Sequence, residues 1–323
     1  MPAIGLLGDV MLGRGVADAL REVPPEELWS EELRSLCASL DLVVCNLECC
    51  ISERGERTRR IAGKPFFFRG PPAAVRALQA IGVRAVSLAN NHALDYEADA
   101  LEDTLGLLRR SGVAAAGAGG GSEEARCGTI VEAGERWIGL ICLSDHPAEY
   151  AAVADAPGIA YADMREGVPE WVRSELAWLR KQCHLVIAFP HWGPNMAAAP
   201  ARWQRRAAAA LQEAGADLVA GHSAHVFHGV EWADRGPVLF DLGDALDDYR
   251  VDPDLRNDLG VLAIWRPGAG QDELELVALR LQFCQTELAH GADADWIAAR
   301  LDRACEELGS RAVRIDEGRF RIA

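Results

Sequence analysis

The sequence predicts an α/β protein whose ligand site lies at the carboxyl edge of a sheet. Short apolar runs alternate with amphipathic segments along most of the chain, as strands and helices do in this fold class. Several apolar runs also end abruptly in carboxylates, amides or imidazoles, and open α/β sheets bind their ligands at such strand ends. The clearest example is the run 83–88, which enters Ala89-Asn90-Asn91-His92-Ala93-Leu94-Asp95 before an amphipathic stretch over 98–110.

Composition limits the class of protein and the kind of partner. The chain has 323 residues, 50% of them hydrophobic and 25% charged, which is typical of one large globular domain or two small ones. A net charge of -16 argues against nucleic-acid or anionic-membrane partners, which are bound through clustered Lys and Arg. The start of the chain lacks a signal-peptide pattern, and no run approaches the ~20 apolar residues of a membrane span. We therefore expect a cytoplasmic protein whose nine cysteines are reduced thiols.

The first half of the chain predicts strands that end in acids. Residues 4–7 run into Gly8-Asp9, and residues 42–45 run into Asn46-Leu47-Glu48. Because side chains alternate along a strand, Asn46 and Glu48 share one face. An apolar stripe predicts a helix over 26–40 between these strands. Residues 52–65 are polar and basic, which indicates a surface excursion, and Phe66-Phe67-Phe68 is expected to return to the core.

The middle of the chain predicts strands that end in histidines. A hairpin is expected over 129–143, then a long connection over 144–167 of the kind that often forms a lid or substrate loop. The strand pattern at 185–189 ends in Pro190-His191, and the pattern at 218–220 enters Gly221-His222-Ser223-Ala224-His225-Val226-Phe227-His228. Three of the eight histidines therefore lie within seven residues, and His is the commonest metal ligand.

The last part of the chain predicts a further acidic strand end and a mainly β C-terminus. Residues 238–240 lead into Asp241-Leu242-Gly243-Asp244. Alternating patterns predict strands over 259–264 and 274–283, followed by a helix over 295–308 and a hairpin over 312–322. Residues 266–272 indicate a turn rather than a linker, so we expect residues 266–323 to pack on a main domain formed by residues 1–265.

Together the polar strand ends offer a mixed set of oxygen and nitrogen ligands. Carboxylate, amide and imidazole donors in combination suit Mn, Fe or Zn rather than Ca or Mg. The set exceeds the roughly four ligands of one zinc ion, which favours two ions that share a bridging carboxylate. Two divalent ions would leave the site positive and able to hold an anionic substrate. The candidate residues are Asp9, Glu48, Asn91, His92, His191, His222 and His225.

Six short motifs in this order resemble a known family. They are Gly8-Asp9-Val10-Met11-Leu12-Gly13-Arg14, Asn46-Leu47-Glu48, residues 88–96, His191-Trp192-Gly193, residues 221–226 and Leu242-Gly243-Asp244. The resemblance, over roughly residues 3–250, is to the CapA family, which is named for capsule and poly-γ-glutamate synthesis and is similar in fold to the calcineurin-like metallophosphoesterases.

This resemblance implies a fold and a set of roles. The fold would be a four-layer αββα sandwich with two metal ions at the strand ends. Glu48 would bridge the ions, Asp9 and His225 would hold one of them, and Asn91, His191 and His222 the other. His92 would act as general acid with Asp95 orienting it. The residues expected to contact substrate are Arg14, Asn46, Asn90, His228 and Asp244.

The chain also departs from the metallophosphoesterase pattern. Met11 stands where a typical member has a histidine ligand, and a thioether is a poor ligand for a hard divalent ion. Two residues rather than one separate His222 from His225, and Glu48 replaces the usual bridging Asp. Asp244 occupies a position where CapA proteins more often have Asn. One of the two metal sites is therefore expected to lack a ligand.

The function expected from these residues is metal-dependent hydrolysis of a small phosphorylated molecule, a phosphatase or phosphodiesterase reaction through metal-activated water. Two alternatives stay open at this point. The same chemistry could cleave an amide or γ-glutamyl bond, or the protein could be a non-catalytic accessory of polymer synthesis. The sequence leaves the substrate and the oligomeric state open, and the pocket walls are expected from the loops 52–64, 144–167 and 194–200.

Overall fold

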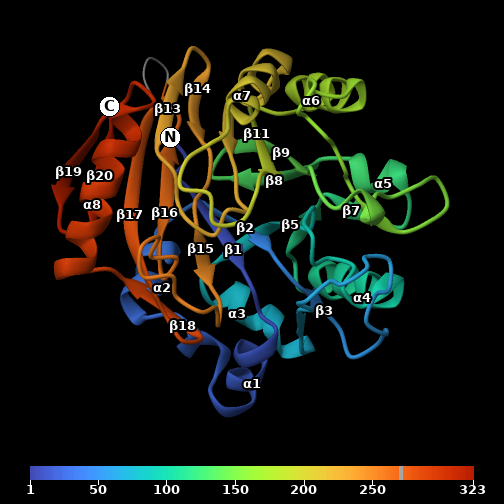
Figure 1. The fold of residues 1–323 in the computed structure, drawn as a ribbon. Helices are drawn as coiled ribbons and strands as arrows, with labels where there is room; N and C mark the ends of the chain where they lie inside the picture. Colours follow the sequence, from blue (N-terminus) through green and yellow to red (C-terminus); the bar gives the residue numbers. More distant parts are fainter. Residues whose placement is uncertain (269–271) are drawn as a thin grey trace.

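Two packed sheets with helices on both outer sides form the molecule (Figure 1). A computed structural model describes residues 1–268 and 272–323. Within these residues, ten strands form the larger sheet and six the smaller one. The turn expected over 266–272 lies partly outside the described residues.

The larger sheet is mixed, and its parallel part carries the N-terminal strands. β1 pairs in parallel with β2 and β15, β2 with β5, and β5 with β6, whereas β1 is antiparallel to β16. The C-terminal strands extend the same sheet through β16 and β17. In sheet order the strands are β19 (Ala312–Asp316), β20 (Arg319–Ile322), β17 (Glu273–Gln282), β16 (Leu259–Arg266), β1 (Ile4–Val10), β2 (Leu42–Leu47), β5 (Val83–Ser87) and β6 (Ala114–Ala116), with β15 (Asp244–Leu246) beside β1 and β18 (Gln285–Leu288) beside β17.

The smaller sheet is parallel in its centre and has an antiparallel hairpin at each edge. Its parallel strands direct their carboxyl ends to the same side. In sheet order it contains β13 (Val230–Ala233), β14 (Gly236–Leu239), β12 (Leu218–Ala220), β11 (Leu185–His191), β9 (Arg136–Ser144) and β8 (Thr129–Ala133). Two short pairs lie apart from both sheets, β3 (Cys50–Ile51) with β4 (Arg69–Gly70) and β7 (Ala118–Gly119) with β10 (Gly158–Ile159).

Helices cover the two outer faces of this sandwich, where α1 to α4 pack on the larger sheet and α6 and α7 on the smaller one (Figure 1). α8 lies beside the C-terminal strands, and most of its buried residues join the cluster between the sheets. Their bounds are α1 (Arg14–Glu22), α2 (Glu31–Ala38), α3 (Val75–Ala80), α4 (Glu97–Arg110), α5 (Ser122–Arg126), α6 (Glu170–Gln182), α7 (Arg202–Ala214) and α8 (Gly291–Glu306), with short 3₁₀ turns η1 (Pro25–Leu28), η2 (Pro72–Ala74) and η3 (Ala148–Tyr150).

Three hydrophobic clusters separate the four layers. Along β16, Val261, Ala263 and Trp265 face the cluster between the sheets, whereas Leu262 and Ile264 face the cluster under the N-terminal helices. The third cluster lies between the smaller sheet and α6 and α7. Alternation along the strands therefore buries both faces of each sheet, which accounts for their continuous apolar runs. The predicted four-layer αββα sandwich is confirmed.

Two local expectations were wrong. The helix expected over 26–40 is interrupted, because Ser30 caps a new helix, its hydroxyl accepting a hydrogen bond from the Leu33 N–H at 3.2 Å. Of the three phenylalanines at 66–68, only Phe68 is buried, and Phe66 is 54% exposed. An apolar triplet does not show which of its side chains reaches the core, because loop geometry decides that.

The sequence predicts reduced cysteines and no membrane-spanning segment, and the structure describes both the thiols and the helices. All nine cysteines are unpaired, and burial raises the pKa values of the clustered Cys45, Cys49 and Cys50 thiols. Such thiols are poor nucleophiles. Throughout residues 1–268 and 272–323, none of the helices is both long and apolar enough to cross a bilayer.

Gly8 provides a test of how tightly the strand end before Asp9 is packed. A Cβ atom at position 8 would overlap the backbone carbonyl oxygen of Gly243, which also accepts a hydrogen bond from the Asp9 N–H at 3.2 Å. Gly8→Ala should therefore destabilise the fold by about 1–3 kcal/mol through overpacking. Urea unfolding measures this loss. Gly120→Ala is the control, because its Cβ would meet only the end of the Glu124 side chain, and equal stability of both variants would contradict the packing argument.

Candidate metal centre

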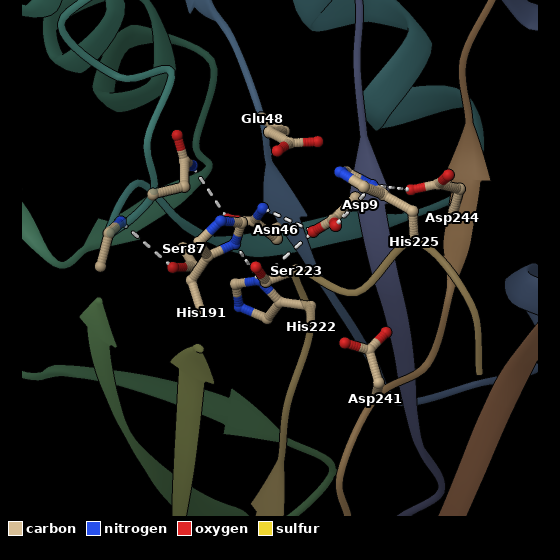
Figure 2. A network of polar contacts seen from close by, with 12 residues as sticks. Asp9, Asn46, Glu48, Ser87, His191, His222, Ser223, His225, Asp241 and Asp244 are labelled. Atoms are coloured by element: carbon tan, nitrogen blue, oxygen red, sulfur yellow. Dashed lines mark hydrogen bonds and ion pairs between the residues drawn. The ribbon is translucent and has the colours of Figure 1, made fainter. Parts of the chain in front are cut away.

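The polar ends of strands from both sheets meet at Asp9. Asp9, near the end of β1, is in register with Asn46 on β2 and with Asp244 on β15, and the β1 ladder shifts register just before Asp9. From the smaller sheet, His191 at the end of β11 forms a parallel bridge with His222. Figure 2 shows these side chains pointing toward one another from the two sheets.

Two sets of side chains here could each bind a metal ion, and each set is a donor group. The first donor group consists of Asp9, His191 and His222. One possible ligand atom from each lies within 4.8 Å of the others. The Nδ1 atoms of His191 and His222 are 2.9 Å apart, and His222 Nδ1 is 3.2 Å from Asp9 Oδ1 (Figure 2). Asn46 fixes the same carboxylate by donating from Nδ2 to Asp9 Oδ1 at 2.7 Å. All these side chains are at most 1% exposed.

The second donor group shares Asp9 with the first. It contains Asp9, Glu48, His225 and Asp244, again with ligand atoms within 4.8 Å of one another. His225 Nδ1 lies 3.5 Å from Asp9 Oδ2 and 2.8 Å from Asp244 Oδ1. Tyr249 donates its hydroxyl hydrogen to Glu48 Oε2 at 3.3 Å. The structure thus places Asp9 in both groups, whereas the family resemblance implied that Glu48 lies between the ions.

The spacing of these donor atoms fits divalent cations. Donors bound to one ion at about 2.0–2.2 Å lie roughly 3 Å apart, and the pairs above are separated by 2.8 to 3.5 Å. Asp9 Oδ2 and Glu48 Oε1 are buried without a hydrogen-bond donor among the described residues. An unpaired buried carboxylate oxygen is costly. A cation held by both groups would satisfy these atoms.

The electrostatics of the centre also favour cations. Burial opposes ionisation of Asp9, but a hydrogen bond from His222 and the charges of His222 and His225 hold the pKa of Asp9 below its usual value. Burial and the charge of Asp9 raise the pKa of Glu48 well above its ordinary range. Burial would lower the pKa of His225, yet the charges of Glu48 and Asp9 raise it. In the second donor group three carboxylates therefore share one imidazole, His225, as their neighbouring positive group.

The loop carrying His222 and His225 has an unusual backbone. Ser223 and His225 have φ angles of 116° and 60°, which non-glycine residues rarely adopt. Asp241 secures the loop by accepting hydrogen bonds from the Ala224 N–H at 2.7 Å and the Gly243 N–H at 2.9 Å. At Gly221 a Cβ atom would overlap the Phe240 carbonyl oxygen. Backbone strain of this kind is concentrated at functional sites.

His92 forms a dyad with Asp95 beside the two donor groups. His92 Nδ1 lies 2.6 Å from Asp95 Oδ2. Asp95 is held in turn by the Phe68 N–H at 2.6 Å, Lys64 Nζ at 3.2 Å and the Tyr150 hydroxyl at 3.3 Å. Burial lowers the pKa of His92 to about 4, against the opposing effect of Asp95. The ring is therefore neutral in the free protein, with Nδ1 directed at Asp95.

A cavity of about 320 Å³ adjoins the centre. His92 and His225 both line it, so it lies between the dyad and the second donor group. The other lining residues are Arg14, Phe66, Phe68, Asn195, Met196, Tyr249, Arg250 and Asn257. Among the loops expected to form the pocket, only 194–200 contributes lining residues.

The other residues expected to contact substrate have hydrogen-bond partners within the protein. Asn90 donates from Nδ2 to Asn46 Oδ1 at 3.0 Å and to the Leu47 carbonyl at 2.8 Å, so both amides support Asp9 from behind. His228 Nε2 lies 2.8 Å from the Ala197 carbonyl oxygen. Asp244 contacts His225 rather than the cavity. Of the expected substrate contacts, Arg14 alone is among the cavity residues given above.

Asn91 is the one amide among the expected metal ligands. Its Oδ1 is buried without a hydrogen-bond donor among the described residues, and its backbone carbonyl accepts from Lys64 Nζ at 2.8 Å. Within the described residues, no hydrogen bond joins its side chain to His191 or His222. Asn91 as a metal ligand therefore stays a prediction.

The sequence did not indicate the roles of several residues that support the centre and the dyad. Lys64 lies in a basic stretch that resembles an exposed surface, yet its side chain is only 8% exposed and contacts Asp95. Tyr249, which donates to Glu48, follows no motif. Asp241 did carry a signal, because it directly follows an apolar strand pattern, but its acidity alone could not indicate a loop-fixing role.

Asp244 gives a prediction about the second donor group. Asp244→Asn keeps the shape of the side chain but removes a carboxylate beside His225. Divalent-ion affinity at that group should fall about 10- to 100-fold, the usual cost of losing a group that supports a ligand, or more if Asp244 binds directly. Competition with a chromophoric chelator measures the affinities. Asp163→Asn, at an exposed acid, is the control, and unchanged binding by Asp244→Asn would exclude its carboxylate from the centre.

This chain is similar to proteins of bacterial capsule and polyglutamine synthesis. Residues 3–249 match the family model described as bacterial capsule synthesis protein PGA_cap. A probable polyglutamine synthesis accessory protein of Mycobacterium tuberculosis is 29% identical, over 95% of this chain and 92% of that protein. The PGA biosynthesis protein CapA of Bacillus subtilis is 25% identical, over 75% of this chain and 62% of its own length. A hypothetical protein from Thermus thermophilus has a similar structure with a TM-score of 0.44 and 15% identity, over 88% of this chain and 95% of that chain.

Proposed function

This chain belongs to the PGA_cap family of bacterial capsule synthesis proteins, and within that family we propose that it is a metal-dependent hydrolase that cleaves a phosphate ester in a small anionic substrate. The observation that carries the proposal is the convergence of two buried donor groups on Asp9, next to the His92–Asp95 dyad. A structural metal site needs no such dyad. A hydrolytic site needs both parts, since it must activate water and protonate a leaving group.

The two donor groups define how the centre would hold its ions. Asp9, His191 and His222 would hold one ion, and Asp9, Glu48, His225 and Asp244 the other. Mn, Fe or Zn suits this mixture of imidazole and carboxylate ligands. A pair of such ions supplies positive charge for phosphoryl oxygens and makes water a better nucleophile at neutral pH. Met11 is not available as a ligand, because its sulfur accepts a hydrogen bond from the Gly13 N–H at 3.0 Å. Asp244 instead supplies the fourth side chain of the second group.

His92 would handle the proton of the leaving group. Asp95 fixes Nδ1 of the ring, which leaves Nε2 to face the substrate. Burial keeps the free ring neutral, with a pKa of about 4. A phosphate ester brings negative charge beside the ring, and nearby negative charge favours the protonated form. Substrate binding would thus promote protonation of Nε2, and the proton could pass from Nε2 to the leaving oxygen.

The names of the relatives favour a second candidate function. Related proteins from two strains of Mycobacterium tuberculosis are described as probable polyglutamine synthesis accessory proteins. A chain with that role would bind metal or polymer without turning over a phosphate ester. Alternatively, the centre would cleave an amide or γ-glutamyl bond, because an activated water can also attack a carbonyl carbon.

One screen separates these functions. The purified protein is loaded with Mn, Zn or Fe and assayed with aryl phosphate monoesters and diesters and with γ-glutamyl anilides. We expect turnover of a phosphate ester, and its loss after dialysis against a chelator. Turnover of the anilide alone would favour amide hydrolysis. Absence of turnover with every metal and every substrate would contradict the enzymatic proposal and favour the accessory role.

A further inference from the structure

Two kinds of residue line the cavity beside His92. The aromatic ones form a wall in which Phe68 stacks on the His92 ring with centroids 3.9 Å apart and Phe66 continues the stack at 6.4 Å from Phe68. Tyr249 lies against Phe68 at 5.7 Å and meets His225 edge-on at 5.3 Å. This aromatic wall therefore runs from the exposed rim at Phe66 inward to the two histidines.

Four other lining residues are cationic or carry amides. They are Arg14, Arg250, Asn195 and Asn257. Guanidinium groups are well suited to planar anions such as carboxylates and to phosphates. A protein with a net charge of -16 repels anions in general, so any anion bound here depends on local cations.

The two arginines are not equivalent. Arg14 is already paired with Asp248 at 3.0 Å, and its guanidinium lies 5.5–5.7 Å from the centroids of Phe66, Phe68 and Tyr249. Arg14 thus forms part of the wall. Arg250 is exposed and, within the part of the chain that the structure describes, has no acidic partner within 4.0 Å. Asn257 holds its backbone, donating from Nδ2 to the Arg250 carbonyl at 3.3 Å.

We propose that this cavity binds the leaving group of the substrate, and that the leaving group is a flat or apolar unit that carries a second negative charge near Arg250. The inference rests on the proposed phosphoester hydrolysis, because it places the leaving oxygen beside His92. The flat part would stack along Phe66 and Phe68, and the distal anion would reach Arg250. A volume of about 320 Å³ is within the lower range of small-molecule sites, so it suits an aromatic or short-chain leaving group rather than a polymer.

Binding of two non-hydrolysable phosphonates tests the proposal separately from catalysis. 4-Carboxybenzylphosphonate and 4-carbamoylbenzylphosphonate have nearly the same shape, but only the first has a distal charge. Calorimetry with the manganese-loaded protein should show about tenfold tighter binding of the carboxylate. Arg250→Ala should reduce that ratio to about one, and Arg250→Lys should restore part of it. Arg21→Ala is the control, because this exposed arginine lies outside the cavity.

Phe66 provides the matching test of the aromatic wall. Phe66→Ala should weaken both phosphonates about five- to tenfold and leave their ratio unchanged, and it should not unfold the protein because Phe66 is 54% exposed. Equal binding of the two phosphonates by the unmodified protein, binding of neither, or an unchanged ratio in Arg250→Ala would overturn the proposal. Retained discrimination without hydrolysis of the corresponding aryl phosphates would instead contradict only the proposed function.

Discussion

Replacing Asp9 by Asn is expected to remove both ions from the centre at once. Asp9 is the residue shared by the two donor groups, and its carboxylate contacts both His222 and His225. The amide keeps the side-chain shape but cannot neutralise two cations. Metal bound per chain should fall from two to well below one. Turnover should fall at least about 10³-fold, because the charge stabilisation supplied by a metal is worth several kcal/mol.

Elemental analysis and initial rates measure the two effects on the same sample. His191→Ala is the informative comparison, because His191 belongs to only one donor group and should lose one ion rather than two. Asp163→Asn, at an exposed acid, should change neither quantity. Two ions retained by Asp9→Asn would exclude Asp9 as the shared ligand and would favour Glu48, as the family resemblance implied.

Replacing His92 by Ala is expected to lower turnover about 10²- to 10⁴-fold without changing the metal content. The ring lies beside the donor groups and is oriented by Asp95, but it belongs to neither group. The loss should be largest for esters with poor leaving groups, since these depend most on protonation of the leaving oxygen. Asp95→Asn should cause a smaller loss, because the ring stays but its orientation and proton affinity change.

Rates for a series of aryl phosphates with increasingly basic leaving groups measure this effect. The dependence on leaving-group basicity should be steeper in His92→Ala than in the unmodified protein. His290→Ala, at a histidine whose side chain is 54% exposed, is the control. An unchanged slope in His92→Ala would remove His92 from the role of general acid. Loss of metal from this variant would instead place its ring among the ligands.

Local patterns were sufficient to predict the strand ends of this fold, whereas the four layers were predicted from the family resemblance. An apolar run that stops at a polar residue indicated the ends of β1, β2, β11 and β12, and with them Asp9, Glu48, His191 and His222. This works because parallel strands bring their carboxyl ends to the same edge of a sheet. The interruption before α2 was missed because an apolar stripe continues across it, while one Ser side chain decides where the helix begins.

The detailed roles within the centre could not be predicted in the same way. Asp9 belongs to both donor groups because of the strand pairing around it. The β1 ladder shifts register at Asp9, and the pairing of β1 with β15 brings Asp244 next to Asp9. Such pairings depend on residues more than 200 positions apart. The family resemblance implied that Asn46 and Asn90 contact substrate. In the structure they form a chain of hydrogen bonds that supports Asp9.

The residues that line the cavity could not be predicted from local sequence patterns either. Phe66, Tyr249 and Arg250 come from segments without a recognisable motif, and only the tertiary fold brings them to His92. Lys64 resembles any surface lysine in sequence, yet it is buried against Asp95 and the Asn91 carbonyl. Long-range packing therefore forms the cavity, whereas local sequence indicates most residues of the two donor groups.

Anomalous diffraction from crystals soaked in manganese tests the central claim most directly. We expect two peaks on opposite sides of the Asp9 carboxylate, one beside His191 and His222 and the other beside Glu48, His225 and Asp244. Their separation should be about 3.5–4 Å, as in other two-metal hydrolytic sites. Absence of density at Asp9, or a single peak that does not contact Asp9, would contradict the account.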